Sequence, residues 1–208
     1  MQSVWRPARL TAQTPSVVRK KEFALNVYKE RASMRGVQRA LGVNRHTLAL
    51  WLLELIARLP AFRNSVEPAE ADDVLELDEL WSFVGKRQQK RWLWVALCRR
   101  TRQIVAFVIG DRSAKTCRKL WQRIPTTYRH CRTFSDLWHA YQQVITTGKH
   151  TSVGKESGET AHVERWNNTL RQRIGRYVRK SLSFSKSDKF HHLVTKWYIY
   201  EYNLSLTT

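Results

Sequence analysis

Hydrophobic residues in the first quarter of the chain recur every three or four positions, which is the spacing of a helix with one buried face. The pattern predicts three helices, with apolar stripes at Phe23, Ala24, Val27 and Tyr28, at Val37, Ala40 and Leu41, and at Leu48, Leu52, Leu55 and Ile56. The turn "LGVN" separates the second helix from the third. In this turn Gly42 supplies backbone freedom and Asn44 is a good N-cap. We therefore expect a small all-α domain over residues 1–57.

Two helices joined by a short turn that contains glycine form a helix-turn-helix. The segment "SMRGVQRALGVNRHTLALWL" resembles this motif as it occurs in many DNA-binding proteins. In such motifs the second helix enters the major groove by its N-terminal residues, which here are Arg45 and His46. A three-helix unit that serves only packing would show the same periodicity, so the motif leaves both interpretations open.

Residues 58–72 contain Pro60, Pro68 and a run of acids, which is typical of a linker between domains. Beyond the linker the pattern changes to short segments rich in β-formers with polar turns between them, which predicts an antiparallel meander followed by mixed elements. The predicted strands are 74–84, 91–98, 104–110 and 131–136, and the predicted helices are 114–124, 162–180 and 187–203. The order β-β-β-α-β-α-α predicts an α/β domain with a mixed sheet over residues 73–208.

The net charge of the chain indicates what kind of partner it binds. Among its 208 residues 37 are Lys or Arg and 17 are Asp or Glu, so the formal net charge is +20. A solvated basic surface is one reading, but nucleic acid is the commonest partner of such an excess. No apolar run approaches the roughly 20 residues that span a bilayer, and the N-terminus has no signal-peptide core, so we expect a cytoplasmic protein. The three cysteines form no C-x-x-C pair, which excludes a zinc ribbon or finger of that kind.

Three carboxylates stand out by the elements that carry them. Asp78 lies within the first predicted strand among apolar residues, where an acid is costly unless it is paired or binds a metal. Glu76 shares its face of the strand and would add repulsion. Asp136 ends the fourth strand, and Glu164 borders the apolar stripe of the helix that follows. This arrangement, with one acid in the first strand, one at the end of the fourth strand and one on a later helix, resembles that of the catalytic acids in the ribonuclease H-like fold of DDE transposases and integrases. Asp136 could instead cap a helix, and Glu164 could pair with a neighbouring arginine.

A basic block follows Glu164, and we expect it to line the path of a phosphate backbone. Its members are Arg171, Arg173, Arg176, Arg179, Lys180 and Lys186. At helical spacing Arg171 shares the stripe of Glu164 and would act near the scissile phosphate, while the others would contact flanking DNA. The alternative is that Arg171 only pairs with Glu164 or Asn168 and stiffens the helix. His139 and His162 stand near the acids, and a part in proton transfer or a structural role is open for each.

Three segments carry a closer resemblance: "DELWSFVGKRQQKRWLWVAL", "TFSDLWHAY" and "HVERWNNTLRQRIGRYVRKSLSFSKS". Together they cover about residues 74–203 and resemble the transposases of the insertion-sequence-one family. The resemblance implies that Asp78, Asp136 and Glu164 are both the catalytic triad and the metal ligands. It also implies two Mg²⁺ ions, for which Mn²⁺ can substitute. Related transposases often carry an N-terminal Cys-rich zinc-binding segment, and this chain shows none, so no zinc is expected.

The same resemblance implies a function. The protein would cut phosphodiester bonds at the ends of an insertion element and join the new 3′-hydroxyls to target DNA. Its partner would be double-stranded DNA in the bacterial nucleoid, and the pairing of two ends implies a homo-oligomer. Two alternatives stay open: a truncated regulator that binds element ends without cutting them, and a ribonuclease H-like nuclease or resolvase that cuts without joining.

Overall fold

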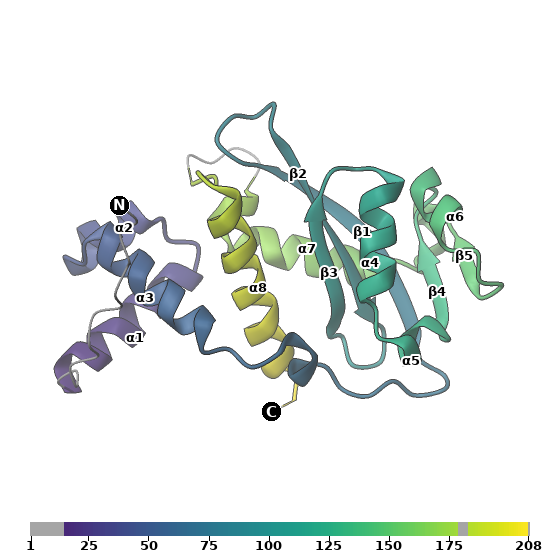
Figure 1. The fold of residues 1–208 in the computed structure, drawn as a ribbon, viewed down its shortest axis with the longest axis horizontal. Coiled ribbons are helices and arrows are strands. Elements are labelled where there is room, and N and C mark those ends of the chain that lie inside the picture. Colours follow the sequence, from purple (N-terminus) through teal and green to yellow (C-terminus); the bar gives the residue numbers. More distant parts are fainter. Residues whose placement is uncertain (1–14, 179–182, 208) are drawn as a thin grey trace, which may run out of the picture.

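The computed structural model describes residues 15–178 and 183–207. Figure 1 shows a group of three helices beside a mixed α/β body, with the long C-terminal helix between them. The three helices are α1 (Pro15–Lys29), α2 (Met34–Leu41) and α3 (Arg45–Ala57). The body contains strands β1 (Val74–Phe83), β2 (Lys90–Cys98), β3 (Ile104–Gly110), β4 (Arg132–Ser135) and β5 (His150–Ser152). Its helices are α4 (Ala114–Arg123), α5 (Thr126–Arg129), α6 (His139–Val144), α7 (Ala161–Arg173) and α8 (Asp188–Leu204).

The turn between α2 and α3 has the geometry that its residues favour. The side chain of Asn44 accepts a hydrogen bond from the backbone N–H of His46 at 2.8 Å and so caps α3. Gly42 ends α2 with φ of +64°, a conformation that other residues adopt at a cost. Most of the predicted stripes are buried, but Phe23 is 58% exposed and Leu25 is buried in its place. Ala40 is exposed as well, because α1 and α2 turn slightly different faces inward than the periodicity alone indicated.

The five strands form one mixed sheet in the order β3-β2-β1-β4-β5. The first three strands pair antiparallel, and β4 runs parallel to β1 with β5 parallel to β4. The mixed α/β sheet that the order of predicted elements indicated is therefore confirmed. The short strand β5 was not predicted, because the three polar residues His150–Ser152 carry no apolar alternation and form a strand only through pairing with β4.

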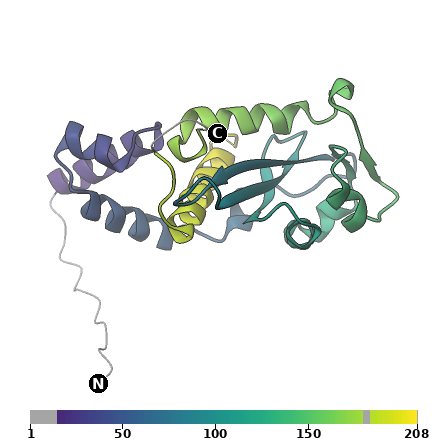
Figure 2. The ribbon, with the colours of Figure 1, turned by 90° about the horizontal axis from the view of Figure 1, so that it is seen from above.

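Helices cover both faces of the sheet, and Figure 2 shows α7 running along one side with α4 on the other. Alternation of side chains along the strands divides the interior accordingly. Leu80, Leu93 and Val95 belong to one cluster of buried residues with members from α7, α8 and the N-terminal helices. Leu77 and Trp94 face the other way and pack with residues of α4, α5 and α6.

The helix predicted over residues 162–180 ends earlier, at Arg173, so that prediction was wrong for residues 174–178, while residues 179 and 180 lie outside the described part of the chain. Ile174 leaves the helix with extended backbone, and a 3₁₀ turn, η3 (Gly175–Tyr177), follows. At Gly175 a Cβ would lie 3.2 Å from the carbonyl oxygen of Arg31. Just after the helix ends, Gly175 thus allows a close approach of these two chain segments, although the helical periodicity continues in the sequence.

The N-terminal helices contact the α/β body through polar as well as apolar groups. Lys29 pairs with Glu201 of α8 at 2.7 Å. The guanidinium of Arg176 donates to the hydroxyl of Tyr28 at 3.1 Å. Another 3₁₀ turn, η1 (Phe62–Ser65), lies in the segment between α3 and β1, and Phe62 packs edge-on against Phe107. None of the described helices has the length and apolar character that crossing a bilayer requires.

Candidate active site

The parallel pairing of β1 with β4 brings two of the predicted acids together. Leu77 lies opposite Ser135 in this pairing, so the next residues, Asp78 and Asp136, stand side by side where β4 ends. Within the described residues Asp78, Glu79 and Asp136 each offer a carboxylate oxygen, and these oxygens lie within 4.8 Å of one another. Carboxylates this close repel one another unless a cation or a proton lies between them.

Asp78 is held on both of its oxygens. Its Oδ1 accepts the backbone N–H of Glu79 at 2.8 Å, and its Oδ2 accepts the side-chain amide of Asn167, on α7, at 2.7 Å. Burial, with the negative charge of Glu79 as a further cause, raises the pKa of Asp78 to about 7. The charged form of Asp78 is thus disfavoured in the protein alone, and a bound cation would stabilise it.

Glu79 points to the opposite face of the sheet and already has partners. Arg112 donates to its Oε1 at 2.7 Å, and the hydroxyl of the buried Tyr141 donates to its Oε2 at 2.9 Å. The guanidinium of Arg112 also lies 3.9 Å from the ring centre of Trp138. Burial and the charge of Asp136 still raise the pKa of Glu79. Sequence reasoning missed Glu79, and its place directly after Asp78 was the one available signal.

Asp136 begins the loop between β4 and α6. Its Oδ1 accepts the backbone N–H of Trp138 at 3.0 Å, which orders the turn before α6. Asp136 is not the N-cap of α6, since that residue is Trp138. The bond to the Trp138 N–H is compatible with metal binding, because a carboxylate can accept on both oxygens. His139 follows on the surface, with its ring 4.2 Å from that of Trp138.

Glu164 lies in the first turn of α7, which packs on the face of β1 that carries Asp78. Its carboxylate accepts the hydroxyl of Thr160 at 3.1 Å and is outside the group of oxygens within 4.8 Å. The helix itself is fixed beside the acids, since Asn167, three residues further on, bonds Asp78. The structure thus brings Asp78 and Asp136 together and holds the Glu164 carboxylate on Thr160, so its metal-binding role stays a prediction.

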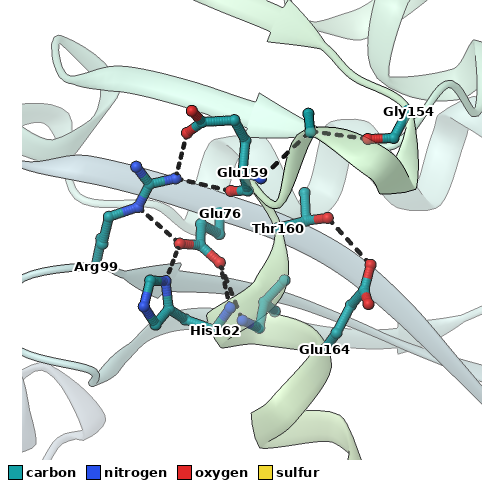
Figure 3. A network of polar contacts seen from close by, with 9 residues as sticks. Glu76, Arg99, Gly154, Glu159, Thr160, His162 and Glu164 are labelled. Carbon is teal, nitrogen blue, oxygen red and sulfur yellow. Dashed lines mark hydrogen bonds and ion pairs between the residues drawn. The ribbon is translucent and has the colours of Figure 1, made fainter.

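Glu76 does not add the repulsion expected from its place two residues before Asp78. It is fully buried, its charge is met by Arg99 at 2.8 Å, and its Oε1 also forms a hydrogen bond with Nδ1 of His162 at 2.6 Å. Figure 3 shows this network at the start of α7, with Thr160 and Glu164 on its other side. His162 therefore has a defined contact, the one with Glu76.

The predicted DNA-contacting residues occupy several parts of the surface. Arg45 and His46 are exposed at the start of α3. Arg171 is half-buried on α7, and the exposed Arg173 lies 3.5 Å from Glu30. Arg179 and Lys180 are outside the described residues. The ammonium of Lys186 lies 4.2 Å from the ring centre of Phe184.

A cavity of about 580 Å³ lies between the N-terminal helices and the α/β body. Cationic side chains from both parts line it: Lys29, Arg35, Arg39, Arg45, Arg176 and Lys186. Its apolar walls include Tyr28, Trp197 and Tyr198. Arg45, at the start of α3, thereby lines the same cavity as Arg176 and Lys186, although these residues are far apart in the sequence.

Comparison with known proteins adds independent findings. The family model described as IS1 transposase matches residues 73–204. The insertion element iso-IS1n protein InsB of Shigella dysenteriae is 38% identical over 126 residues, which are 61% of this chain and 93% of that protein. The insertion element IS1 protein InsB of Shigella flexneri is 36% identical over 124 residues, covering 60% of this chain and 92% of that protein. A chain from the cryo-EM structure of the simian T-cell lymphotropic virus intasome with PP2A regulatory subunit B56 gamma aligns at 10% identity. Its TM-score is 0.43, and the match covers 86% of this chain and 64% of that chain.

Proposed function

We propose, given that the chain belongs to the IS1 transposase family, that it cuts DNA at insertion-element ends and joins the new 3′-hydroxyls to target DNA. The observation that carries this proposal is the pair Asp78 and Asp136, set side by side at the end of β4, with Glu164 on the helix packed over the same strand. Such a group of acids on a strongly basic chain suits a site that binds a cation and a phosphate together.

The donor set fits a hard divalent cation. Asp78 and Asp136 offer carboxylate oxygens within 4.8 Å of each other, and Mg²⁺ prefers carboxylate and phosphate oxygens. We infer that Asp78, Asp136 and Glu164 hold two Mg²⁺ ions, with Mn²⁺ as a substitute. When bound, such ions activate the attacking oxygen and stabilise the leaving oxygen in displacement at phosphorus. Glu79 is the poorer ligand, because its charge is already met by the guanidinium of Arg112 and its side chain points to the face of the sheet opposite α7.

The other residues would hold the DNA. Arg45 and His46 would contact base edges from the start of α3, because groove contacts specify sequence while phosphate contacts position the duplex. Arg176 and Lys186 line the basic cavity beside Arg45 and would bind the backbone across the two parts of the chain. Arg171 would contact a phosphate near Glu164, and Arg173, with Arg179 and Lys180, would contact flanking DNA. Pairing of two element ends requires at least a dimer in the active complex.

The test is a joining assay with a labelled element-end duplex and a plasmid target in Mg²⁺. We expect Asp78→Asn, Asp136→Asn and Glu164→Gln each to abolish cleavage and joining while DNA binding is largely kept. Asp72→Asn is the matched control, since it removes one exposed acid close to β1 in the chain. Binding without cleavage would favour the regulator, and cleavage without joining the nuclease. A triad variant with near wild-type cleavage would remove that residue from the ligand set.

A further inference from the structure

The start of α7 takes its capping group from another element of the fold. The first N–H groups of a helix lack partners within the helix. At α7 the residue before the helix, Thr160, gives no side-chain cap, since its hydroxyl donates to Glu164 instead. The N–H groups of His162 and Val163 both donate to Oε2 of Glu76, on β1, at 3.0 Å. A carboxylate 86 residues upstream thus caps the helix that carries Glu164.

Glu76 is well suited to this task. Its side chain is 0% exposed, and its Oε1 accepts Nε of Arg99 at 2.8 Å and bonds Nδ1 of His162 at 2.6 Å. Four donors therefore converge on its two oxygens, as Figure 3 shows around the carboxylate. The partial positive charge at a helix N-terminus adds to this attraction. A buried carboxylate that is satisfied in this way resists displacement, because any shift leaves a charge without its partners.

A second contact fixes the register of α7 on β1. Asn167 donates to Asp78, which lies two residues after Glu76 on the same face of the strand. Two residues of a strand span about 6.6 Å, and the four residues from Val163 to Asn167 rise about 6 Å along the helix. The two spacings match, so both contacts form in one register. A slip of one residue would break both and turn Glu164 by about 100°.

Arg99 connects the Glu76 carboxylate, which caps α7, with other elements of the site. Its Nη2 donates to the backbone oxygen of Glu159 at 2.8 Å and to the carboxylate of Glu159 at 2.7 Å, just before α7. Its guanidinium also lies 5.3 Å from the ring centre of Phe134, on the strand that leads to Asp136. One guanidinium thus touches β1 through Glu76, β4 through Phe134 and the segment that enters α7.

We propose that Glu76, supported by Arg99, is the positioning residue for Glu164 relative to Asp78 and Asp136. This proposal rests on the proposed function, since it concerns how the same site is assembled. Glu76 itself does not contact the substrate; it acts by fixing the rotation and height of α7.

The test compares Glu76→Gln with Asp73→Asn in the full-length chain. Glutamine keeps one acceptor oxygen but turns an N–H₂ toward groups that all donate, so the cap is broken with little change in volume. Asp73 is an apt control: it is buried at the start of β1, pairs with Arg100 at 2.7 Å, and accepts the N–H of Glu70, away from α7. Both variants remove one buried charge from an arginine pair, so both should lower the melting temperature.

We expect Glu76→Gln to lower kcat for cleavage by about 10- to 100-fold, the usual effect of losing a group that orients a ligand. The KM for DNA should stay near that of the wild type. Asp73→Asn should leave kcat near the wild-type value, because the bonds of Asp73 to Arg100 and Glu70 lie away from α7. Hydrogen exchange gives a second readout: backbone amides at 162–166 should exchange faster in Glu76→Gln, while those of the β1–β2 pairing stay protected.

Two outcomes would overturn the positioning role while the proposed function stands. One is faster exchange at the start of α7 with cleavage like that of the wild type. The other is an equal fall in kcat for Glu76→Gln and Asp73→Asn, which would reflect lost stability alone. A wild-type protein that cleaves no element end would overturn the proposed function and the positioning role with it.

Discussion

The charge on Asp78 should destabilise the protein when no divalent cation is bound, and this can be measured. The proposed perturbation is Asp78→Asn, which removes the charge and keeps the shape. Asparagine can still accept the N–H of Glu79 through its oxygen. Its amide nitrogen would face Asn167, whose buried Oδ1 has no hydrogen-bond partner among the described residues, so a flip of the Asn167 amide restores a hydrogen bond. The variant therefore tests electrostatics with little disturbance of packing.

The magnitude follows from the pKa of Asp78, which burial and the charge of Glu79 raise from 3.8 to about 7. A difference of about 3 units corresponds to roughly 4 kcal/mol between the two protonation states. Because Asp78 keeps part of its surface in solvent, a discount to about 2–4 kcal/mol is appropriate. The sign follows from proton binding: between pH 4 and 7 the folded state holds more protons than the unfolded state. The wild type therefore loses stability relative to Asp78→Asn as pH rises through this window, and the gap is complete above pH 7.

The assay is urea unfolding in EDTA at several values between pH 4 and 8, with Asp72→Asn as a charge control. We expect the two curves to meet near pH 4 and Asp78→Asn to be more stable by about 2–4 kcal/mol at pH 8. Adding Mg²⁺ should then stabilise the wild type, by about 2.7 kcal/mol at a hundred times Kd, and leave the variant unchanged. The claim that the Asp78 charge is disfavoured in the metal-free fold would be refuted if Asp78→Asn were no more stable than the wild type at pH 8. It would also be refuted if the stability difference at pH 4 equalled that at pH 8.

Three further predictions concern other parts of the chain. Burial, aided by the charge of Arg176, lowers the pKa of His191 from 6.5 to about 4, so only the unfolded state gains this proton as pH falls from 6.5 to 4. The wild type should lose about 3 kcal/mol of stability over that window relative to His191→Gln. Urea unfolding measures this loss, with exposed His139→Gln as the control. If the wild type and His191→Gln show the same dependence of unfolding free energy on pH, the prediction is wrong. Arg45→Ala should reduce the preference for element-end over random duplex by about 1–3 kcal/mol, because a bidentate base contact is worth that much. Competition binding measures this preference, and an unchanged preference in Arg45→Ala would make the helix-turn-helix a packing unit. Lys186→Ala should instead lower the slope of log affinity against log salt concentration by about one.

The sequence indicated the parts of the site that depend on local pattern. Helical spacing placed Leu48 and Leu52 in a core, and Gly42 and Asn44 marked the turn that the structure shows. Alternation in β1 and the strand-like run before Asp136 placed two acids on elements that pair. Their meeting follows once β1 and β4 are parallel neighbours, and the helical crossover between β3 and β4 made that pairing the natural arrangement.

Tertiary structure decided what periodicity cannot express. The partners of Glu76 are Arg99 and the start of α7, and the partners of Glu79 are Arg112 and Tyr141, all far away in the sequence. The same holds for the end of α7, where Gly175 must pass close to the backbone of Arg31. A one-dimensional pattern reports which face of an element is buried. It does not report which charged groups meet there, because that depends on strand register and helix rotation, and these are fixed only when the whole core packs.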